Sequence, residues 1–420
     1  MTTLHERVRA HLAAPLALPC GVSLPNRFAK AAMTEQMAEP VTNAPNTLHE
    51  TLYARWGKSG CGMLLTGNVM VDRVCMENLR NVAIEDERDL DALRRWADAA
   101  QAEGAHLWMQ ISHAGRQSPK KVTRQPVAPS AVGLERKSLK TIFAPPRALT
   151  VPEIENLIQA FGRTAAVAQS AGFKGVQIHS AHGYLCSEFL SPITNQRTDD
   201  WGGTPEKRRR FLLEAIRAVR ERVGPGFPIG VKLNSADFQR GGFSEEESME
   251  VVKALEETGV DLIEISGGNY ENPAMLPARA STKAREAYFL EYAEKVRAVS
   301  KVPLMLTGGF RSAEAMCDAV ESGAVDVIGL ARPLCVEPDF ARRLMEGETD
   351  RALPITISTG IRVFDDMLQS FWFNHQMRRM ANGLDPHPGV SKWTVLMRGI
   401  LEQAVANPFV KTRAYPEVAG

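Results

Sequence analysis

Residues 302–334 read VPLMLTGGFRSAEAMCDAVESGAVDVIGLARPL and contain a strand, a helix and a second strand in succession. The short apolar runs at 303–307 and 325–330 are typical of buried strands. The amphipathic segment between them, at 312–322, is typical of a helix. Because a strand–helix–strand unit of this length joins parallel strands, the stretch predicts a parallel sheet with helices on its face.

The same alternation of apolar runs and longer amphipathic segments recurs along most of the chain. The sequence predicts eight strands, at 27–32, 63–68, 106–111, 175–179, 228–234, 262–266, 303–307 and 325–330. Helical patterns lie near 47–59, 89–102, 151–171, 206–223, 244–258, 285–299, 312–322 and 338–346. Eight such repeats predict an α/β fold of the closed (β/α)₈ TIM-barrel type. A doubly wound sheet is the competing architecture, but it would rarely need eight near-regular repeats.

Other segments frame the predicted barrel. Residues 16–24, with Cys20 and Gly21 at their centre, predict an N-terminal hairpin that caps the bottom of the barrel. After about residue 348 the sequence becomes rich in Trp, Met and Arg, and an amphipathic helix follows near 391–405. We interpret this part as a C-terminal helical extension packed on the barrel, and divide the chain into a barrel at 1–347 and an extension at 348–420. The long proline-rich segment 112–150 is expected to form a lid.

Charge and hydropathy exclude several classes of protein. The 420 residues include 50 Lys and Arg and 49 Asp and Glu, so the net charge of +1 favours neither nucleic acid nor an anionic membrane. No apolar run approaches the roughly 20 residues that span a bilayer, and the N-terminus lacks the pattern of a secretory signal. The six scattered cysteines form no CxxC pair, which argues against a metal site. We expect a cytoplasmic protein.

The loops after the seventh and eighth strands predict a phosphate site. Gly308 and Gly309 follow the seventh strand, and Ala331 and Arg332 follow the eighth. TIM barrels commonly bind phosphate at these two loops through backbone N–H groups. Glycine allows the backbone to approach an anion, and a guanidinium adds a charge-assisted contact. A glycine pair alone is more often just a turn, but both loops together favour an anion site.

The fourth strand ends in Ile178-His179-Ser180-Ala181-His182-Gly183-Tyr184, which places two imidazoles and a phenol at the barrel mouth. If a helical turn begins there, His182 shares the face of His179. Two imidazole N–H groups can hold one carbonyl oxygen and stabilise an enolate charge. A phenol with a pKa of about 10 can protonate the adjacent carbon. The alternatives are a strand cap with a merely packed Tyr184, or a zinc site, for which no third ligand is evident.

Several separated motifs in the sequence together form a pattern that is typical of a protein family. They are LPNRFAKAAMTE (24–35), GCGMLLTGNVMV (60–71), WMQISHAGRQ (108–117), VQIHSAHGYLCSEFLSPITNQRTDDWGG (176–203), PLMLTGGFRSAEAM (303–316) and DVIGLARPL (326–334). Over roughly residues 15–346 the chain resembles the old yellow enzyme family of FMN-dependent oxidoreductases. The chain after residue 346 has no cysteine and no GxGxxG. The iron–sulfur cluster and second nucleotide domain of the family's larger members are therefore not expected.

The resemblance implies an FMN site at the strand ends. Ala32, Met33 and Thr34 would lie along the isoalloxazine ring, with the Thr34 hydroxyl near the flavin O4. Gln110 would contact the pyrimidine side of the ring. Lys232 stands where the family usually has an arginine beside the flavin N1 and O2. Lysine keeps the positive charge but lacks the planar guanidinium, which bears on the redox potential and the placement of the ring.

The resemblance also implies the roles of the remaining site residues. His179 and His182 would bind the carbonyl oxygen of the substrate, and Tyr184 would donate the proton. Gly309 and Arg332, with the backbone amides of their neighbours, would hold the FMN phosphate. No metal is expected at the site.

The resulting hypothesis is a flavin oxidoreductase that takes hydride from NADH or NADPH and passes it through flavin N5 to the activated C=C bond of an enone-like small molecule. One pocket for both half-reactions predicts ping-pong kinetics. The alternative is a barrel lyase or isomerase acting on a phosphorylated sugar, with Lys232 as a Schiff-base lysine. A third interpretation is a barrel that only binds. The substrate, the choice between NADH and NADPH and the oligomeric state stay open, although the apolar tail is compatible with a homodimer.

Overall fold

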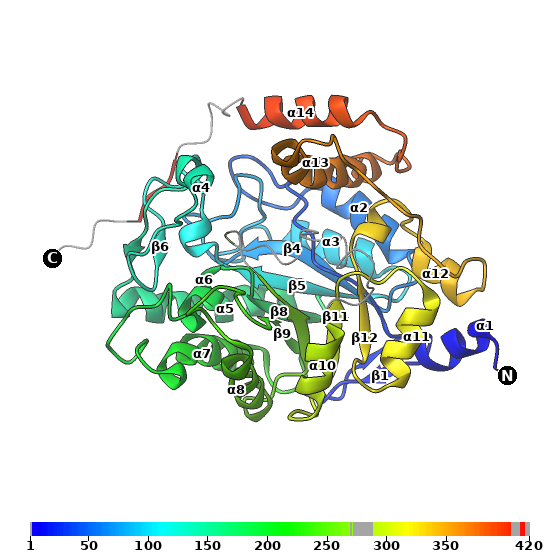
Figure 1. Ribbon diagram of the computed structural model, residues 1–420, viewed down its shortest axis with the longest axis horizontal. Helices are drawn as coiled ribbons and strands as arrows, with labels where there is room; N and C mark the ends of the chain where they lie inside the picture. Colours follow the sequence, from blue (N-terminus) through cyan, green and yellow to red (C-terminus); the bar gives the residue numbers. More distant parts are fainter. Residues whose placement is uncertain (1, 269–270, 272–288, 405–411, 416–420) are drawn as a thin grey trace.

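The computed structural model describes residues 2–268, 271, 289–404 and 412–415. Within them, eight parallel strands close into a barrel (Figure 1). In chain order the strands are β3 (Phe28–Lys30), β4 (Met63–Met70), β5 (His106–Ser112), β8 (Gly175–Ser180), β9 (Ile229–Asn234), β10 (Leu262–Ser266), β11 (Leu304–Thr307) and β12 (Val327–Leu330). Each strand pairs with the next along the chain, and β12 pairs with β3 to close the ring. The predicted TIM barrel is confirmed.

Helices follow the strands and cover the outside of the barrel (Figure 1). They are α2 (Thr47–Gly57), α3 (Leu90–Gln101), α5 (Val151–Ser170), α7 (Pro205–Val223), α8 (Glu245–Glu257), α10 (Leu290–Arg297), α11 (Ala313–Glu321) and α12 (Phe340–Met345). Each lies at a predicted place, but residues 285–288 of the predicted helix 285–299 lie outside the described residues. Capping boxes fix three of these starts: Asn46 pairs with His49 at α2, Thr150 with Glu153 at α5, and Ser244 with Glu247 at α8.

The bottom of the barrel is closed by apolar side chains. The hairpin of β1 (Leu16–Ala17) and β2 (Ser23–Leu24) contributes Leu16 and Leu24 to a cluster that includes Trp108 and Leu262 from the barrel strands. A Cβ on Gly175 would come within 2.6 Å of the Trp108 ring, so the glycine makes room for the indole. Because apolar side chains fill the bottom of the barrel, the polar groups of a site are expected at the opposite end, where the strands terminate.

Shorter elements complete the described part of the chain. They are α1 (Leu4–Arg7), η1 (Val8–Leu12), η2 (Gly115–Gln117), β6 (Val127–Ala128), α4 (Lys137–Ile142), β7 (Arg147–Ala148), α6 (Leu185–Leu190) and η3 (Arg332–Cys335). The predicted lid segment 112–150 is therefore not one open loop. It contains a helical turn, a short helix and a two-stranded parallel sheet formed by β6 and β7.

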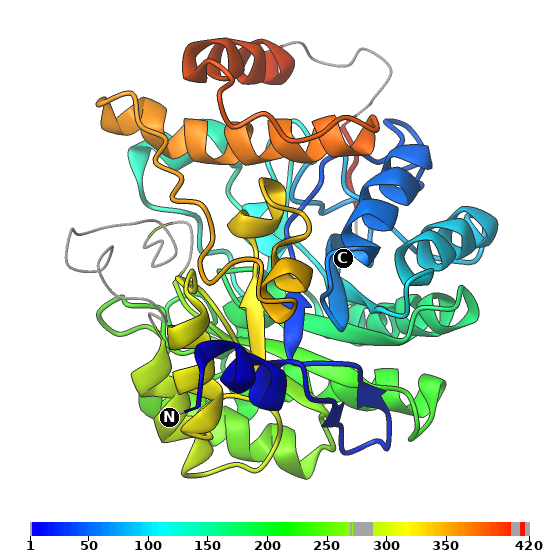
Figure 2. The same cartoon turned by 90° about the vertical axis from the view of Figure 1, so that its right-hand side faces the viewer.

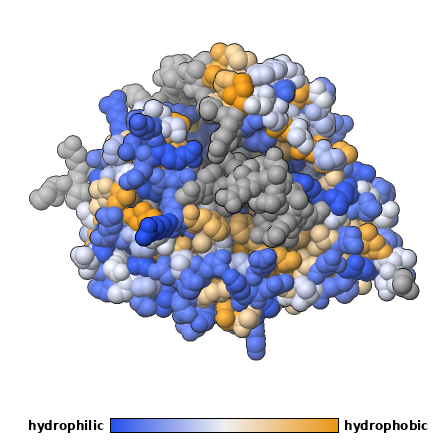
Figure 3. All heavy atoms as spheres, viewed as in Figure 1, coloured by the Kyte–Doolittle hydropathy of each residue, from blue (hydrophilic) through white to orange (hydrophobic). Residues whose placement is uncertain are grey.

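Two helices follow the barrel. α13 (Arg362–Ala381) packs against α2 and η3, and α14 (Lys392–Ala404) lies on the outer side of α13 (Figures 1 and 2). A Cβ on Gly399 would come within 2.4 Å of the Phe371 ring, so the two helices approach closely. α14 exposes Trp393, Met397 and Leu401, and Figure 3 shows apolar side chains at the top of the molecule. No helix among the described residues is long and apolar enough to cross a membrane.

The described end of the chain, residues 412–415, returns to the barrel. The Arg413 guanidinium donates to the Val41 carbonyl at 3.0 Å and to the Asn43 side chain and the Arg73 carbonyl at 3.1 Å each. The Tyr415 hydroxyl lies 2.5 Å from an Asp72 carboxylate oxygen. These contacts fasten the chain end to the loops that follow β3 and β4.

Candidate active site at the mouth of the barrel

The two predicted histidines and the predicted tyrosine come together at the end of β8. The His179 ring centroid lies 5.0 Å from that of His182 and 4.9 Å from that of Tyr184. The turn between the strand and α6 is not helical, because His182 has a φ of +60° and α6 begins only at Leu185. The helical turn on which a shared face of His179 and His182 depended does not form here, although the two rings do meet.

Contacts from distant strands hold His182 in its left-handed conformation, which non-glycine residues adopt uncommonly. Its backbone N–H donates to the Asn234 side chain at 3.2 Å. Its Nε2 lies 2.7 Å from the Ser266 hydroxyl. The Gln117 side-chain amide donates to its carbonyl at 2.9 Å. Three elements outside the local sequence thus fix the direction of this imidazole.

Burial keeps both imidazoles neutral. Burial, together with the nearby charge of Lys232, lowers the pKa of His182 to about 3. Burial, His182 and Lys232 place the pKa of His179 well below its ordinary value. The Ala181 N–H donates to Nδ1 of His179 at 3.4 Å, which leaves the ring hydrogen on Nε2. A neutral imidazole carries one N–H donor and no positive charge. The pair therefore suits a carbonyl oxygen better than an anion, which a cationic group would bind.

The phenol of Tyr184 faces a carboxylate that was not predicted. The Tyr184 hydroxyl lies 3.2 Å from Oε2 of Glu77. The side-chain amide of Asn68, in β4, and the hydroxyl of Thr34 donate to the same carboxylate. Removal from water raises the pKa of Glu77. Glu77 lies in a loop without periodic pattern, so nothing local pointed to it, whereas Asn68, as a polar residue in an apolar strand, was a visible signal.

A second polar chain crosses the barrel below the histidines. The Gln110 side-chain amide donates to that of Gln177 at 2.5 Å, and Gln177 donates to Glu264 at 2.8 Å. The Glu264 carboxylate also lies 3.0 Å from the Lys232 ammonium. Strand register explains the meeting, since Gln110 pairs with Gln177, and Lys232 pairs with both His179 and Glu264. The predicted Gln110 and Lys232 therefore belong to one network, and Gln177 and Glu264 were missed.

The predicted residues Ala32, Met33 and Thr34 form the segment directly after β3. A Cβ on Gly67 would come within 2.6 Å of the Met33 carbonyl oxygen, so the segment lies tightly against β4. The Gly67 N–H donates to Glu35 at 2.8 Å. The Met33 sulfur lies 3.5 Å from the thiol sulfur of Cys335, in η3. The segment is thus fixed from β4 on one side and η3 on the other.

The predicted phosphate loops have an open backbone. Gly308 and Gly309 have φ angles of 139° and 86°, which favour glycine. Ala331 precedes η3, and the exposed Arg332 guanidinium lies 5.8 Å from the Phe373 ring of α13. No pattern in the sequence indicated that α13 would lie beside this loop.

These groups fit the chemistry of FMN. The isoalloxazine ring needs donors along its pyrimidine edge, and Lys232 and the Gln110 amide are groups that could serve there. The phosphate needs backbone N–H groups and a cation, and the Gly308–309 turn and Arg332 are groups that could serve there. The buried hydroxyl of Thr307, directly before the glycines, has no hydrogen-bond partner among the described residues, and a ligand oxygen would satisfy it.

Residues 11–351 match the family described as NADH:flavin oxidoreductase / NADH oxidase. The NADH-dependent flavin oxidoreductase nadA of Aspergillus parasiticus is 41% identical over 383 residues, covering 87% of this chain and 84% of that protein. The NADH-dependent flavin oxidoreductase iliE of Neonectria sp. is 39% identical over 354 residues, covering 78% of this chain. The matched region spans only 46% of that longer protein.

Solved structures share the barrel. The 2-naphthoyl-CoA reductase in complex with 2-naphthoyl-CoA superimposes with a TM-score of 0.74 at 28% identity, covering 80% of this chain and 52% of that chain. The old yellow enzyme homologue from Zymomonas mobilis superimposes with a TM-score of 0.68 at 25% identity. It covers 83% of this chain and 97% of its own.

Proposed function

This chain belongs to the NADH:flavin oxidoreductase / NADH oxidase family and is an FMN-dependent oxidoreductase of the old yellow enzyme type, and we propose that it reduces the activated C=C bond of α,β-unsaturated carbonyl compounds. The observation that carries the proposal is the cluster at the end of β8. Two neutral imidazoles with centroids 5.0 Å apart lie beside a phenol, which is the donor set that a polarised carbonyl and its neighbouring carbon require.

When bound, FMN supplies two-electron transfer between a reduced nicotinamide and the substrate. Gln110 and Lys232 would hold the pyrimidine edge of its ring, and Gly309 and Arg332 would hold its phosphate. Ala32, Met33 and Thr34 would form the wall beside the ring, and Gly308 and Ala331 would contribute backbone groups at the phosphate end.

The two histidines would hold the substrate oxygen. His179 offers its Nε2–H, because its Nδ1 accepts from the Ala181 N–H. In His182, the Ser266 hydroxyl would donate to Nε2, which leaves the ring hydrogen on Nδ1 for the substrate. Both donors would stabilise the negative charge that develops on the carbonyl oxygen as the double bond is reduced.

Tyr184 would then give its phenol proton to the carbon next to the carbonyl group. Tyr184 is 5% exposed and its ring contacts His179, so the ring that carries the proton donor lies beside the oxygen donors. A proton donor in hydrogen-bond reach of its acceptor typically accelerates such a step by about 10²–10⁴-fold.

The alternative lyase mechanism is not supported. A Schiff-base lysine must present a free amine, and the Lys232 ammonium is instead buried against the Glu264 carboxylate at 3.0 Å. The family relationship points in the same direction.

The test is spectroscopic. Purified protein loaded with FMN should be yellow and should bleach when NADH or NADPH is added anaerobically. Addition of cyclohexenone without oxygen should then restore the colour and yield cyclohexanone. A protein that does not bind FMN contradicts the whole proposal. Bleaching that no enone reverses contradicts only the proposed substrate class.

A further inference from the structure

We propose that Glu77 is a positioning residue that acts through Tyr184, orienting its phenol and returning a proton to it from solvent after each turnover. The inference rests on the proposed function, because it concerns the proton that Tyr184 gives to the substrate. It is carried by the contact between the Tyr184 hydroxyl and Oε2 of Glu77, 3.2 Å apart.

The carboxylate contacts the buried phenol and belongs to a residue that is partly exposed. Tyr184 is 5% exposed and its ring packs against His179, so water has little access to its hydroxyl. Glu77 is partly exposed and lies in the loop between β4 and α3. Asn68 and Thr34 donate to its carboxylate and fix its direction. Because this partly exposed residue contacts the phenol, we infer that its side chain is a route for a proton from solvent to Tyr184.

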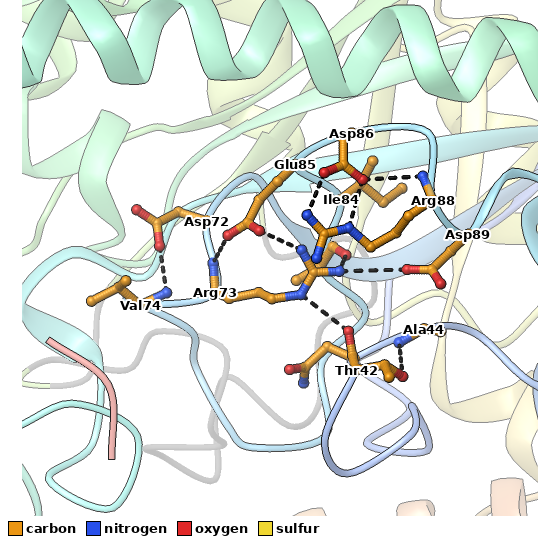
Figure 4. A network of polar contacts seen from close by, with 12 residues as sticks. Thr42, Ala44, Asp72, Arg73, Val74, Ile84, Glu85, Asp86, Arg88 and Asp89 are labelled. Atoms are coloured by element: carbon orange, nitrogen blue, oxygen red, sulfur yellow. Dashed lines mark hydrogen bonds and ion pairs between the residues drawn. The ribbon is translucent and has the colours of Figure 1, made fainter. Parts of the chain in front are cut away.

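The loop that carries Glu77 is held by a network around Arg73 (Figure 4). The Arg73 guanidinium binds Glu85 and Asp89 and donates to the Thr42 and Ala83 carbonyls at 3.0 Å each. The Arg73 carbonyl in turn accepts from Arg413 at the chain end. These contacts hold the start and the end of the loop between β4 and α3. The backbone that carries Glu77 is therefore fixed relative to Tyr184.

The charges around Glu77 disfavour the state in which the Glu77–Tyr184 pair has lost a proton, so that state is short-lived. The carboxylate of Glu35 and removal from water disfavour the anion of Glu77, while the donors Asn68, Thr34 and Tyr184 favour it, and its pKa is raised on balance. A phenolate beside this carboxylate would place two negative charges about 3 Å apart, which is strongly unfavourable. Once Tyr184 has lost its proton, the pair therefore takes one up readily.

The proton balance is simple. The O–H bond of Tyr184 breaks as a C–H bond forms at the substrate carbon next to the carbonyl group, which leaves a phenolate. The Glu77 carboxylate then takes up a proton from water and gives it to the phenolate, so an O–H bond of water breaks, a new O–H bond forms on Tyr184 and the carboxylate is restored. Neither side chain changes its oxidation state.

The first test separates the two half-reactions. In Glu77→Gln the side chain keeps its size but carries no exchangeable acid proton. We expect reduction of the bound flavin by NADH or NADPH to be unchanged, and its reoxidation by cyclohexenone over repeated turnovers to slow about tenfold or more. Glu87→Gln, an exposed glutamate of the same loop, is the matched control and should match the wild type in both steps.

The second test reads the phenol itself and needs neither nicotinamide nor substrate. The tyrosinate absorbance of the holoenzyme is followed against pH, and the same titration of Tyr184→Phe is subtracted to isolate Tyr184. Removal of the neighbouring carboxylate in Glu77→Gln should move the ionisation of Tyr184 to lower pH. An unchanged titration would show that the two groups are not coupled, and would overturn the proposal.

The third test is chemical rescue. In Glu77→Ala the space of the carboxylate is empty, and added formate should restore the reoxidation rate, whereas in Glu77→Gln the amide fills the space and formate should have no effect. Equal loss of both half-reactions without rescue would show a merely structural role. If the wild type itself is not reoxidised by enones, the proposed function fails, while the tyrosinate titration still decides the coupling of Glu77 and Tyr184.

Discussion

Lys232 and Glu264 occupy paired positions on neighbouring strands, and their ammonium and carboxylate groups lie 3.0 Å apart with 3% and 0% of the side chains exposed. Gln177 donates to the other carboxylate oxygen at 2.8 Å. Both charges are therefore compensated inside the barrel. The cation that the flavin would meet at this place belongs to an ion pair, not to an isolated lysine.

Replacing Lys232 with Met should destabilise the protein by about 3–5 kcal/mol, because the Glu264 carboxylate would stay buried without its partner. Chemical unfolding followed by fluorescence measures the loss. Lys253→Met removes an exposed ammonium that pairs with Glu250, and should change stability by about 0.5 kcal/mol or less. The double variant Lys232→Met/Glu264→Leu should recover much of the loss. Equal stabilities of Lys232→Met and Lys253→Met would contradict the importance of the pair.

Replacing Tyr184 with Phe should leave reduction of the flavin by the nicotinamide nearly intact and slow reoxidation by an enone by about 10²-fold or more. The ring and its contact with His179 remain, so only the proton donor is lost. Anaerobic stopped-flow absorbance measures both rates. Tyr292→Phe, which removes a buried hydroxyl bonded to Ser248 on the outer helices, should change neither rate. Equal slowing of the two half-reactions in Tyr184→Phe would refute the assigned role.

The barrel was predictable because each strand is a short apolar run and each helix an amphipathic one, so local pattern and global topology agree. His179, His182 and Tyr184 were predictable because they lie within six positions at a strand end. The direction of His182 was not, since Asn234 and Ser266 fix it from strands β9 and β10.

The hydrogen-bond and ion-pair partners of the predicted residues could not be predicted from the sequence either. Glu77 meets Tyr184 across 107 positions of sequence, and Arg413 meets Asn43 across 370. Such contacts follow from how loops fold over the barrel mouth, and no periodic pattern in a single sequence encodes them. Lys232 was visible as a buried cation at a strand end, but its partner Glu264 became clear only from the register of β9 and β10.

Replacing Tyr415 with Phe should lower the free energy of unfolding by about 1–3 kcal/mol. Its hydroxyl lies 2.5 Å from the Asp72 carboxylate and 3.0 Å from Nε2 of His113, and both groups would lose a partner. Hydrogen exchange should increase in the loop after β4, which the chain end contacts. Thr412→Ala, next to the contact, is the control and should leave exchange in this loop unchanged. Unaltered exchange in Tyr415→Phe would show that the chain end does not brace the loop.

Replacing His182 with Gln should flatten the dependence of stability on pH between pH 5 and about 6.5. The folded protein holds His182 at a pKa of about 3, against an ordinary value of 6.5. Between these two pH values, His182 binds a proton in the unfolded chain but not in the folded chain. The free energy of unfolding of the wild type therefore decreases as the pH falls. One such proton contributes a slope of about 1.4 kcal/mol per pH unit.

The measurement is chemical unfolding of the wild type and His182→Gln at a series of pH values, with the difference between the two curves as the readout. His113, whose pKa burial lowers to about 4, titrates in both proteins and cancels in that difference. Above pH 7 the unfolded imidazole is neutral as well, so the two curves should run parallel there, which serves as the internal control. Curves that stay parallel down to pH 5 would show that the folded protein tolerates a charged His182. That result would remove the basis for treating the two imidazoles as neutral donors to a carbonyl oxygen.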